Sequence, residues 1–149
     1  MFSSYKFKID SWSIGLFLLM MLPNFLWFAF PAPNDVLRIT SVTPITDAIG
    51  SFLQLSLIAT LSCLAHKNSK PLSFSAGIVA TLICVMVYFV GWVLYYNAIT
   101  YAWVILMLTL PPCLAFLSYA IDRKNWIATT LGVGFTVCHL VFALVNFIL

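Results

Sequence analysis

The chain has 149 residues, of which 63% are hydrophobic and only 7% are charged. A soluble globular domain is about a quarter charged, so this composition excludes an ordinary water-soluble fold and indicates that lipid is the main solvent. The formal net charge of +3 comes from Lys and Arg residues grouped between apolar runs, where such residues set membrane topology, and we expect no nucleic-acid partner.

Five apolar runs follow one another along the chain, and each is close to the ~20 residues that a helix needs to cross a bilayer. The sequence therefore predicts an all-α fold, a polytopic membrane helix bundle with five transmembrane helices. We expect the whole chain, residues 1–149, to form a single integral membrane domain. The predicted helices cover residues 13–30, 45–65, 74–96, 101–121 and 126–149.

The first run, 13–30, has two interpretations, because Lys6 and Lys8 precede it as basic residues precede the apolar core of a secretory signal. Pro31 and Pro33 lie where a signal would be cut, and no A-x-A-like site follows the run. We therefore interpret this run as an uncleaved membrane anchor.

The second run, 45–65, carries a polar face. Asp47, Ser51 and Gln54 are spaced at i, i+4 and i+7, which places them on one side of a helix. Asp47 also has a simpler interpretation, because it is the fourth residue after a capping Thr43. The helix dipole stabilises a carboxylate at that position without any ligand.

The third run, 74–96, contains small and polar residues at steps of four and three, which form one continuous stripe on a helix. Small residues allow a neighbouring helix to approach closely, so we interpret the stripe as a packing surface in preference to a conduit. Its members are Gly77, Thr81, Cys84, Tyr88, Gly91 and Tyr95.

Prolines interrupt two of the predicted helices near mid-depth. Pro23 lies in the first run, and Pro111 and Pro112 lie in the fourth run, 101–121. A proline removes a backbone donor and frees the carbonyl one turn earlier, so we expect kinks at both places. Kinked helices with freed carbonyls are typical of the midplane sites of transporters.

The fifth run, 126–149, follows a capping Asn125 and carries His139 and Asn146, seven residues apart on one stripe. His139 is a titratable group at mid-depth, and imidazole changes charge between about pH 5 and 8, so coupling to a proton is one interpretation. The alternative is a neutral imidazole that is bonded to Asn24, Gln54 or a freed carbonyl.

Polar side chains within the span define a candidate ligand site. If the N-terminus is cytoplasmic, most of these side chains lie between the midplane and the outer leaflet, where together they can line one outward-opening cavity. The alternative is that the amides act only as hydrogen-bonding glue between helices. The candidate ligand-binding residues are Asn24, Asp47, Gln54, Tyr88, His139 and Asn146.

Two further patterns limit the chemistry. The chain has no Glu and no CxxC pair, so we expect no catalytic set, no metal site and no cofactor. In the loop between the first two runs, Asp35 and Arg38 are three residues apart, and we interpret them as a solvated ion pair.

These patterns favour a small, non-enzymatic, multi-pass protein of the bacterial cytoplasmic membrane that binds or transports a small ligand. One alternative is an accessory, assembly or immunity-type subunit that binds a larger membrane partner through its helix faces. A second alternative is a small membrane-embedded enzyme. The expected partners are the lipid bilayer and either further copies of this chain or that larger membrane protein.

The distribution of basic residues predicts the orientation. Six of the seven Lys and Arg residues lie on the side of the N-terminus, and Arg38 alone lies on the other side. By the positive-inside rule the N-terminus is cytoplasmic and the C-terminus is outside. The six residues are Lys6, Lys8, Lys67, Lys70, Arg123 and Lys124.

A reporter fused after Leu149 tests this orientation. We expect an enzyme that is active only outside the cytoplasm to give a signal there, and a reporter that is active only in the cytoplasm to give none. The opposite pair of signals would contradict the positive-inside count.

Overall fold

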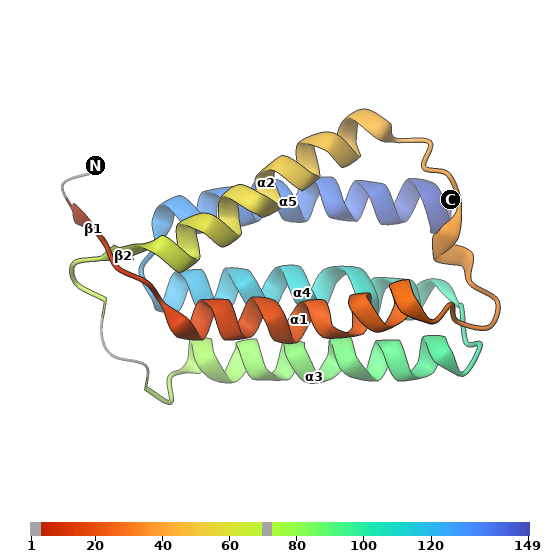
Figure 1. Cartoon of the computed structure of the whole chain (residues 1–149), viewed down its shortest axis with the longest axis horizontal. Coiled ribbons are helices and arrows are strands. Elements are labelled where there is room, and N and C mark those ends of the chain that lie inside the picture. Colours follow the sequence, from red (N-terminus) through yellow and green to blue (C-terminus); the bar gives the residue numbers. More distant parts are fainter. Residues whose placement is uncertain (1–3, 70–72) are drawn as a thin grey trace.

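The structure is a computed structural model that describes residues 4–69 and 73–149, so the predicted cytoplasmic Lys70 lies outside the described residues. Five helices in the described ranges are long and apolar enough to span a membrane, and the protein is therefore a membrane helix bundle (Figure 1). In chain order the elements are β1 (Tyr5–Phe7), α1 (Ser11–Ala29), the 3₁₀ turn η2 (Val36–Arg38), α2 (Pro44–Cys63), β2 (Leu64–His66), α3 (Ala76–Tyr96), α4 (Ala102–Asp122), α5 (Trp126–Ala143) and the π turn η3 (Leu144–Ile148).

The predicted bounds agree with the observed ones to within two residues at every helix end except the last, where α5 passes into the π turn η3. Side-chain caps mark the starts of α1, α3 and α5. The cap expected at Thr43 is not formed, because the Thr43 side chain makes no capping bond at the start of α2. Asn125 accepts a hydrogen bond from the backbone N–H of Ala128, as predicted. At α3 the same role belongs to Ser75, whose hydroxyl accepts from the N–H of Ile78.

Helix α4 is central, and half of its apolar span is buried. It packs against α3 on one side and α5 on the other, and α2 in turn packs on α5. Helix α1 crosses this group with far fewer contacts and lies over α4 in Figure 1. The bundle thus has a tightly packed part, α3 with α4, and a looser part around α1.

Two glycines of the predicted stripe explain the close packing of α3 on α4. A Cβ atom at Gly91 would lie 3.0 Å from the Cβ of Met107, and one at Gly77 would lie 2.8 Å from the Cβ of Asp122. Between them, the hydroxyl of Thr81 reaches the carbonyl of Ala115 at 3.3 Å. These contacts support the interpretation of the stripe as a packing surface.

The N-terminal end of the bundle contains a pairing that the hydrophobic pattern does not predict. Strands β1 and β2 pair antiparallel, with Tyr5 opposite His66 and Phe7 opposite Leu64. Helix α2 was expected to continue to Ala65, but it ends at Cys63 because the next residues are extended and bond to the N-terminal segment. Strands this short carry little periodicity, and the partners are about sixty positions apart, so no local signal marks them.

Hydrogen bonds of polar side chains join distant segments at the same end of the bundle. One carboxylate oxygen of Asp10 accepts from the backbone N–H of Trp12, and the other accepts from the Tyr119 hydroxyl at 2.9 Å and lies 3.6 Å from Nε of Arg123. The buried Asn125 donates to the carbonyl of Leu64 at 2.7 Å. This end is therefore fixed by hydrogen bonds between segments far apart in the sequence.

At the opposite end, Asp35 joins the loop after α1 to α3. Its carboxylate accepts hydrogen bonds from Nε1 of Trp27, from the hydroxyl of Tyr95 at 2.7 Å and from Nε of Arg38 at 2.8 Å. The predicted Asp35–Arg38 pair is confirmed. The expectation that it is solvated holds for the Arg38 side chain, which is 39% exposed, but not for that of Asp35, which is only 11% exposed. Trp27 and Tyr95 exclude the water that the sequence interpretation assumed.

The environment of Asp35 changes its ionisation. Burial favours the neutral acid, but the hydrogen bonds from Trp27, Tyr95 and Arg38, together with the Arg38 charge, outweigh it and lower the pKa below the ordinary 3.8. A carboxyl group whose pKa is lower in the folded state stabilises the fold above its unfolded pKa, and this contribution is lost as the pH falls through the folded value.

We therefore expect Asp35→Asn to lower the free energy of unfolding at pH 7 by about 1–3 kcal/mol, the range for hydrogen bonds to a charged group. Thermal unfolding in detergent, measured from pH 7 down to pH 3, checks this. The wild type should lose stability below about pH 4, and the variant should lose less over that range. Parallel curves for the two proteins would contradict the assignment.

The close contact at Gly91 leads to a second expectation. Gly91→Val should lower the free energy of unfolding by about 1–3 kcal/mol, because the side chain overpacks the α3–α4 contact. Gly15→Val is the matched control, since nothing lies within 4 Å of a Cβ atom at Gly15, and it should leave the thermal midpoint nearly unchanged. Equal losses in the two variants would show that α3 and α4 do not approach closely at Gly91.

Candidate functional site

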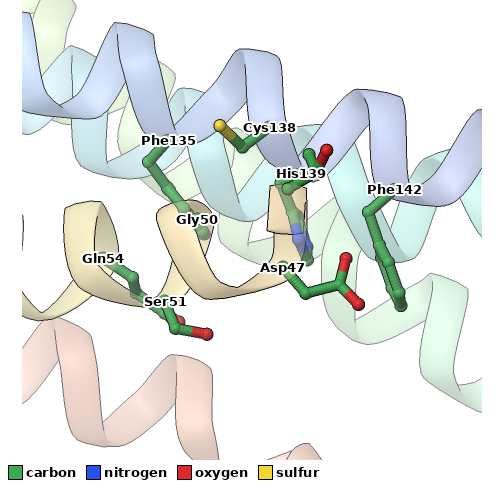
Figure 2. A pocket seen from close by; sticks show the side chains of 9 residues that line it. Asp47, Gly50, Ser51, Gln54, Phe135, Cys138, His139 and Phe142 are labelled. Atoms are coloured by element: carbon green, nitrogen blue, oxygen red, sulfur yellow. The ribbon is translucent and has the colours of Figure 1, made fainter. Parts of the chain in front are cut away.

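Two adjoining cavities lie within the bundle. The first, which we call the Asp47 cavity, has a volume of about 210 Å³ and lies between α2 and α5 (Figure 2). Thr46 and Asp47 come from the first turn of α2, and Phe142 comes from the last turn of α5, so this cavity lies toward the C-terminal end of the bundle. Its lining residues are Thr46, Asp47, Gly50, Ser51, Gln54, Phe135, Cys138, His139 and Phe142.

The second cavity, which we call the Tyr88 cavity, has a volume of about 260 Å³ and is lined by residues of all five helices. It lies beside α1, the most loosely packed helix. Gln54, Phe135 and His139 line both cavities, so the two adjoin at these side chains. The lining residues are Phe17, Met20, Met21, Asn24, Gln54, Tyr88, Leu108, Pro112, Phe116, Phe135 and His139.

The polar wall of the Asp47 cavity follows from the spacing of residues on α2. Asp47, Ser51 and Gln54 all line this cavity, as their i, i+4, i+7 spacing predicts for one helical face. Gly50 brings α2 close to α5, because a Cβ atom there would lie 3.3 Å from the Cβ of Cys138. The absence of a side chain at Gly50 thus lets the polar face of α2 meet α5.

His139 forms part of an aromatic wall on α5. Its ring stacks on Phe135 at a centroid distance of 5.1 Å and an interplanar angle of 23°, and it is nearly parallel to Phe142 at 6.2 Å. Figure 2 shows the imidazole directed toward α2, on the side of Asp47. Within residues 4–69 and 73–149, neither ring nitrogen has a hydrogen-bond partner, and no ion pair joins His139 to Asp47. The proposed bond from His139 to Asn24, Gln54 or a freed carbonyl is therefore not formed in this structure.

Gln54, like His139, lacks a hydrogen-bond partner among the described residues. Its side-chain amide is partly buried and makes no hydrogen bond to any other residue that the structure describes. An amide carries two donor hydrogens and an acceptor oxygen, and polar groups removed from bulk water in proteins are nearly always bonded. Gln54 and His139 therefore bring free donors and acceptors to the same two cavities.

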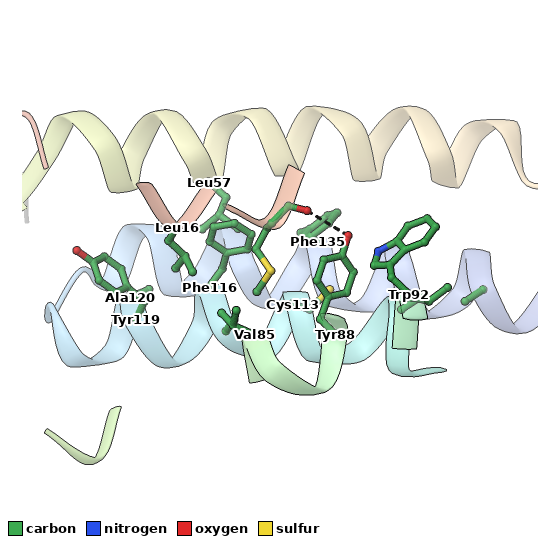
Figure 3. Close-up of a cluster of buried hydrophobic side chains, with 14 of the residues drawn as sticks. Leu16, Leu57, Val85, Tyr88, Trp92, Cys113, Phe116, Tyr119, Ala120 and Phe135 are labelled. Atoms are coloured by element: carbon green, nitrogen blue, oxygen red, sulfur yellow. Dashed lines mark hydrogen bonds between the residues drawn. The ribbon is translucent and has the colours of Figure 1, made fainter. Parts of the chain in front are cut away.

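Asn24 and Tyr88 lie in the Tyr88 cavity, but they bond to each other. The amide nitrogen of Asn24 donates to the Tyr88 hydroxyl at 2.7 Å and to the carbonyl of Met20 at 3.0 Å. The Tyr88 hydroxyl also reaches the carbonyl of Met20 at 3.1 Å, the bond drawn in Figure 3. The Asn24–Tyr88 contact fits the glue interpretation, since it joins α1 to α3.

Asn146 lines neither cavity, but it contacts a lining residue of the Asp47 cavity through one intermediate residue. Its amide nitrogen donates to Oγ1 of Thr43 at 2.9 Å, and its oxygen accepts from the N–H of Val42 at 2.8 Å. Oγ1 of Thr43 in turn donates to the carboxylate of Asp47 at 3.0 Å. Asn146 thus holds the start of α2 in place and, through Thr43, orients Asp47.

The structure divides the six candidate residues into groups. Asp47, Gln54 and His139 share the Asp47 cavity, Asn24 and Tyr88 join Gln54 and His139 in the Tyr88 cavity, and Asn146 supports Asp47 from outside. Sequence reasoning missed the aromatic residues Phe135 and Phe142. Their spacing of i−4 and i+3 from His139 places them on its face of α5, and that signal was available in the sequence.

The bonding difference between Gln54 and Asn24 is testable with matched substitutions. Asn24→Leu should lower the free energy of unfolding by about 1–2 kcal/mol, because it breaks a bond between helices. Gln54→Leu should keep or raise the thermal midpoint, because it replaces an amide without a protein partner by an apolar group. A loss at Gln54 as large as that at Asn24 would show that Gln54 is bonded within the protein.

Comparisons with known proteins do not assign these cavities. No family model matches the sequence, and no curated protein or solved structure is significantly similar to the chain. The function has to be argued from the two cavities and from the polar groups that line them.

Proposed function

We propose that this chain is a small multi-pass membrane protein that binds a small molecule in the Asp47 and Tyr88 cavities. The observation that supports this most is that Gln54 and His139 line both cavities without a protein partner in the described part of the chain. A free hydrogen-bonding group within a membrane span costs free energy, and such residues usually mark a ligand or ion pathway. A bound molecule supplies the missing partners.

The lining of the cavities suits a small amphipathic ligand. Ligand sites are typically concave and mostly apolar, with a few polar groups that fix the orientation of the ligand. Phe135 and Phe142 supply apolar walls, whereas Gln54 and His139 supply the polar groups. Each cavity, at about 210 or 260 Å³, is below the ~300–1,000 Å³ of sites for drug-sized molecules, so a ligand held in one cavity is smaller than these.

We infer a cytoplasmic N-terminus from the distribution of Lys and Arg, and the short loops between the helices favour a bacterial cytoplasmic membrane. In this orientation the Asp47 cavity faces the outside of the cell, because it lies near the start of α2 and the end of α5. The loose packing of α1 beside the Tyr88 cavity gives the bundle an element that can move during entry or release. We propose that the small molecule binds from outside the cell, and transport of this molecule across the membrane is the extension of this proposal.

A second candidate function is that of a subunit within a larger membrane complex. The observation that favours it is again α1, which has few contacts with the rest of the bundle and at which Gly15 has nothing within 4 Å of its Cβ position. A helix from another chain can pack closely against such a surface. The two functions predict that different partners remain bound to the purified protein, a small molecule in the first case and a second, different chain in the second.

Native mass spectrometry of protein extracted gently from its membrane tests both candidates. We expect the wild type to retain a small molecule, and the double variant Gln54→Leu with His139→Leu to lose it. Thr136→Val is the matched control on α5, because Thr136 does not belong to the lining of either cavity and its hydroxyl donates to the carbonyl of Gly132 on its own helix, and it should retain the molecule.

Two outcomes would change the proposal. Equal retention, or none, in the wild type and the double variant would refute binding at Gln54 and His139. A second, different chain present in constant ratio would establish the subunit function instead.

A further inference from the structure

We infer that the ligand is a small organic cation whose ammonium group contacts the carboxylate of Asp47 and whose apolar part lies against Phe135 and Phe142. This inference rests on the proposed function and adds the chemical class of the ligand. It is argued from the charge of the Asp47 cavity, from the bonding of its carboxylate and from its aromatic wall.

The carboxylate of Asp47 is incompletely bonded. A carboxylate offers about four acceptor positions, and the side chain of Asp47 accepts one hydrogen bond, from Oγ1 of Thr43. Across the described ranges, no Lys, Arg or His nitrogen lies within 4.0 Å of it, since the ion pairs found there involve Asp35 and Asp10. The helix dipole supports the charge in part, but the carboxylate keeps acceptor positions free, and Asp47 lines the cavity.

The basic residue on the same side of the bundle is already engaged. Arg38 bonds to the carboxylate of Asp35 and to the carbonyl of Trp27, and its guanidinium carbon lies 4.8 Å from the centroid of the Trp27 ring. Movement of Arg38 to Asp47 would break these contacts and leave Asp35 buried with fewer partners. A cation for Asp47 therefore has to come from outside the chain.

The charge of the lining excludes other ligand classes. Asp47 is the one acid in this lining, His139 and Cys138 are its other titratable groups, and no Lys or Arg takes part. With the imidazole neutral, the lining carries a charge of −1. An anionic ligand would be repelled, and a neutral ligand would leave the carboxylate desolvated and without a counter-charge, which is costly in a medium of low dielectric constant.

Aromatic rings complete the match to an organic cation. Phe135 and Phe142 line the same cavity as Asp47. Ammonium groups are attracted to the faces of aromatic rings, and quaternary ammonium groups are commonly recognised in this way. A hard metal ion such as Ca²⁺ or Mg²⁺ would use oxygen ligands and would gain nothing from the two phenylalanines. Among the described residues, no group of three or more His, Cys, Asp or Glu side chains could hold a metal ion.

A cysteine at Ser51 reports on the charge of the cavity. Ser51 is exposed and lines the Asp47 cavity, and Ser51→Cys is nearly isosteric. In a background with the four native cysteines replaced by alanine, the reaction rates of this thiol are measured with two methanethiosulfonate reagents of similar size. One carries a trimethylammonium group and the other carries a sulfonate group. Val42→Cys, in the loop before α2 and outside both cavities, is the control position.

We expect the trimethylammonium reagent to react faster than the sulfonate reagent at Ser51→Cys by roughly tenfold more than at Val42→Cys, a ratio that corresponds to 1.4 kcal/mol. Asp47→Asn should remove this preference. Choline should protect the Ser51→Cys thiol from N-ethylmaleimide, whereas 3,3-dimethyl-1-butanol, its uncharged isostere, should not. Thermal midpoints of the variants confirm that each protein is folded.

The possible failures are distinguishable. Equal rates with the two reagents, or a preference that persists in Asp47→Asn, would overturn the assignment of an organic cation but leave a ligand at Gln54 and His139 possible. Equal protection by choline and by its uncharged isostere would have the same meaning. A thiol at Ser51→Cys that reacts with neither charged reagent nor N-ethylmaleimide would show that the cavity is closed to ligands, and both proposals would fall.

Discussion

The constraint on which this structure depends is that a polar group within a membrane must find its partner inside the protein or in something bound to it. Most groups obey the first alternative. Asp10 is bonded to Tyr119 at the N-terminal end, Asp35 is bonded to Trp27 and Tyr95 at the other end, and Asn24 is bonded to Tyr88 between them. Against this background, two unbonded side chains on facing helices that line the same two cavities indicate a site more strongly than either would alone.

The position of the site follows from how unevenly the bundle is packed. Glycines fix α3 against α4, and this rigid pair supports α5. Helices α1 and α2 complete the bundle, and α1 makes the fewer contacts. The Asp47 cavity lies between α2 and α5, and the Tyr88 cavity is lined by all five helices. The hydrogen bonds from Asn146 through Thr43 to Asp47 fix the acidic end of the site, whereas its other side borders α1, the most loosely packed helix.

The sequence predicts the helices well because spanning length and apolar composition are local properties, and the helices lie close to their expected bounds except at the C-terminal end of α5. It does not predict the pairing of Tyr5–Phe7 with Leu64–His66, whose partners are far apart in the chain. Spacing on α2 correctly grouped Asp47 with Gln54, but whether an amide is glue or a ligand group depends on its neighbours. Asn24 and Gln54 look alike in sequence and differ only in what faces them. Membrane orientation stays a prediction.

The central claim is that His139 finds its hydrogen-bond partner outside the protein. Solid-state NMR of the protein in lipid bilayers, with nitrogen-15 in the histidine rings, tests it directly, and His66 at the N-terminal end serves as an internal reference. We predict through-space contacts from the His139 ring nitrogens to protons of a bound molecule or of water, and a shift of these signals when small molecules are removed by dialysis. A contact to an amide or backbone carbonyl of the chain, unchanged by dialysis, would contradict the account.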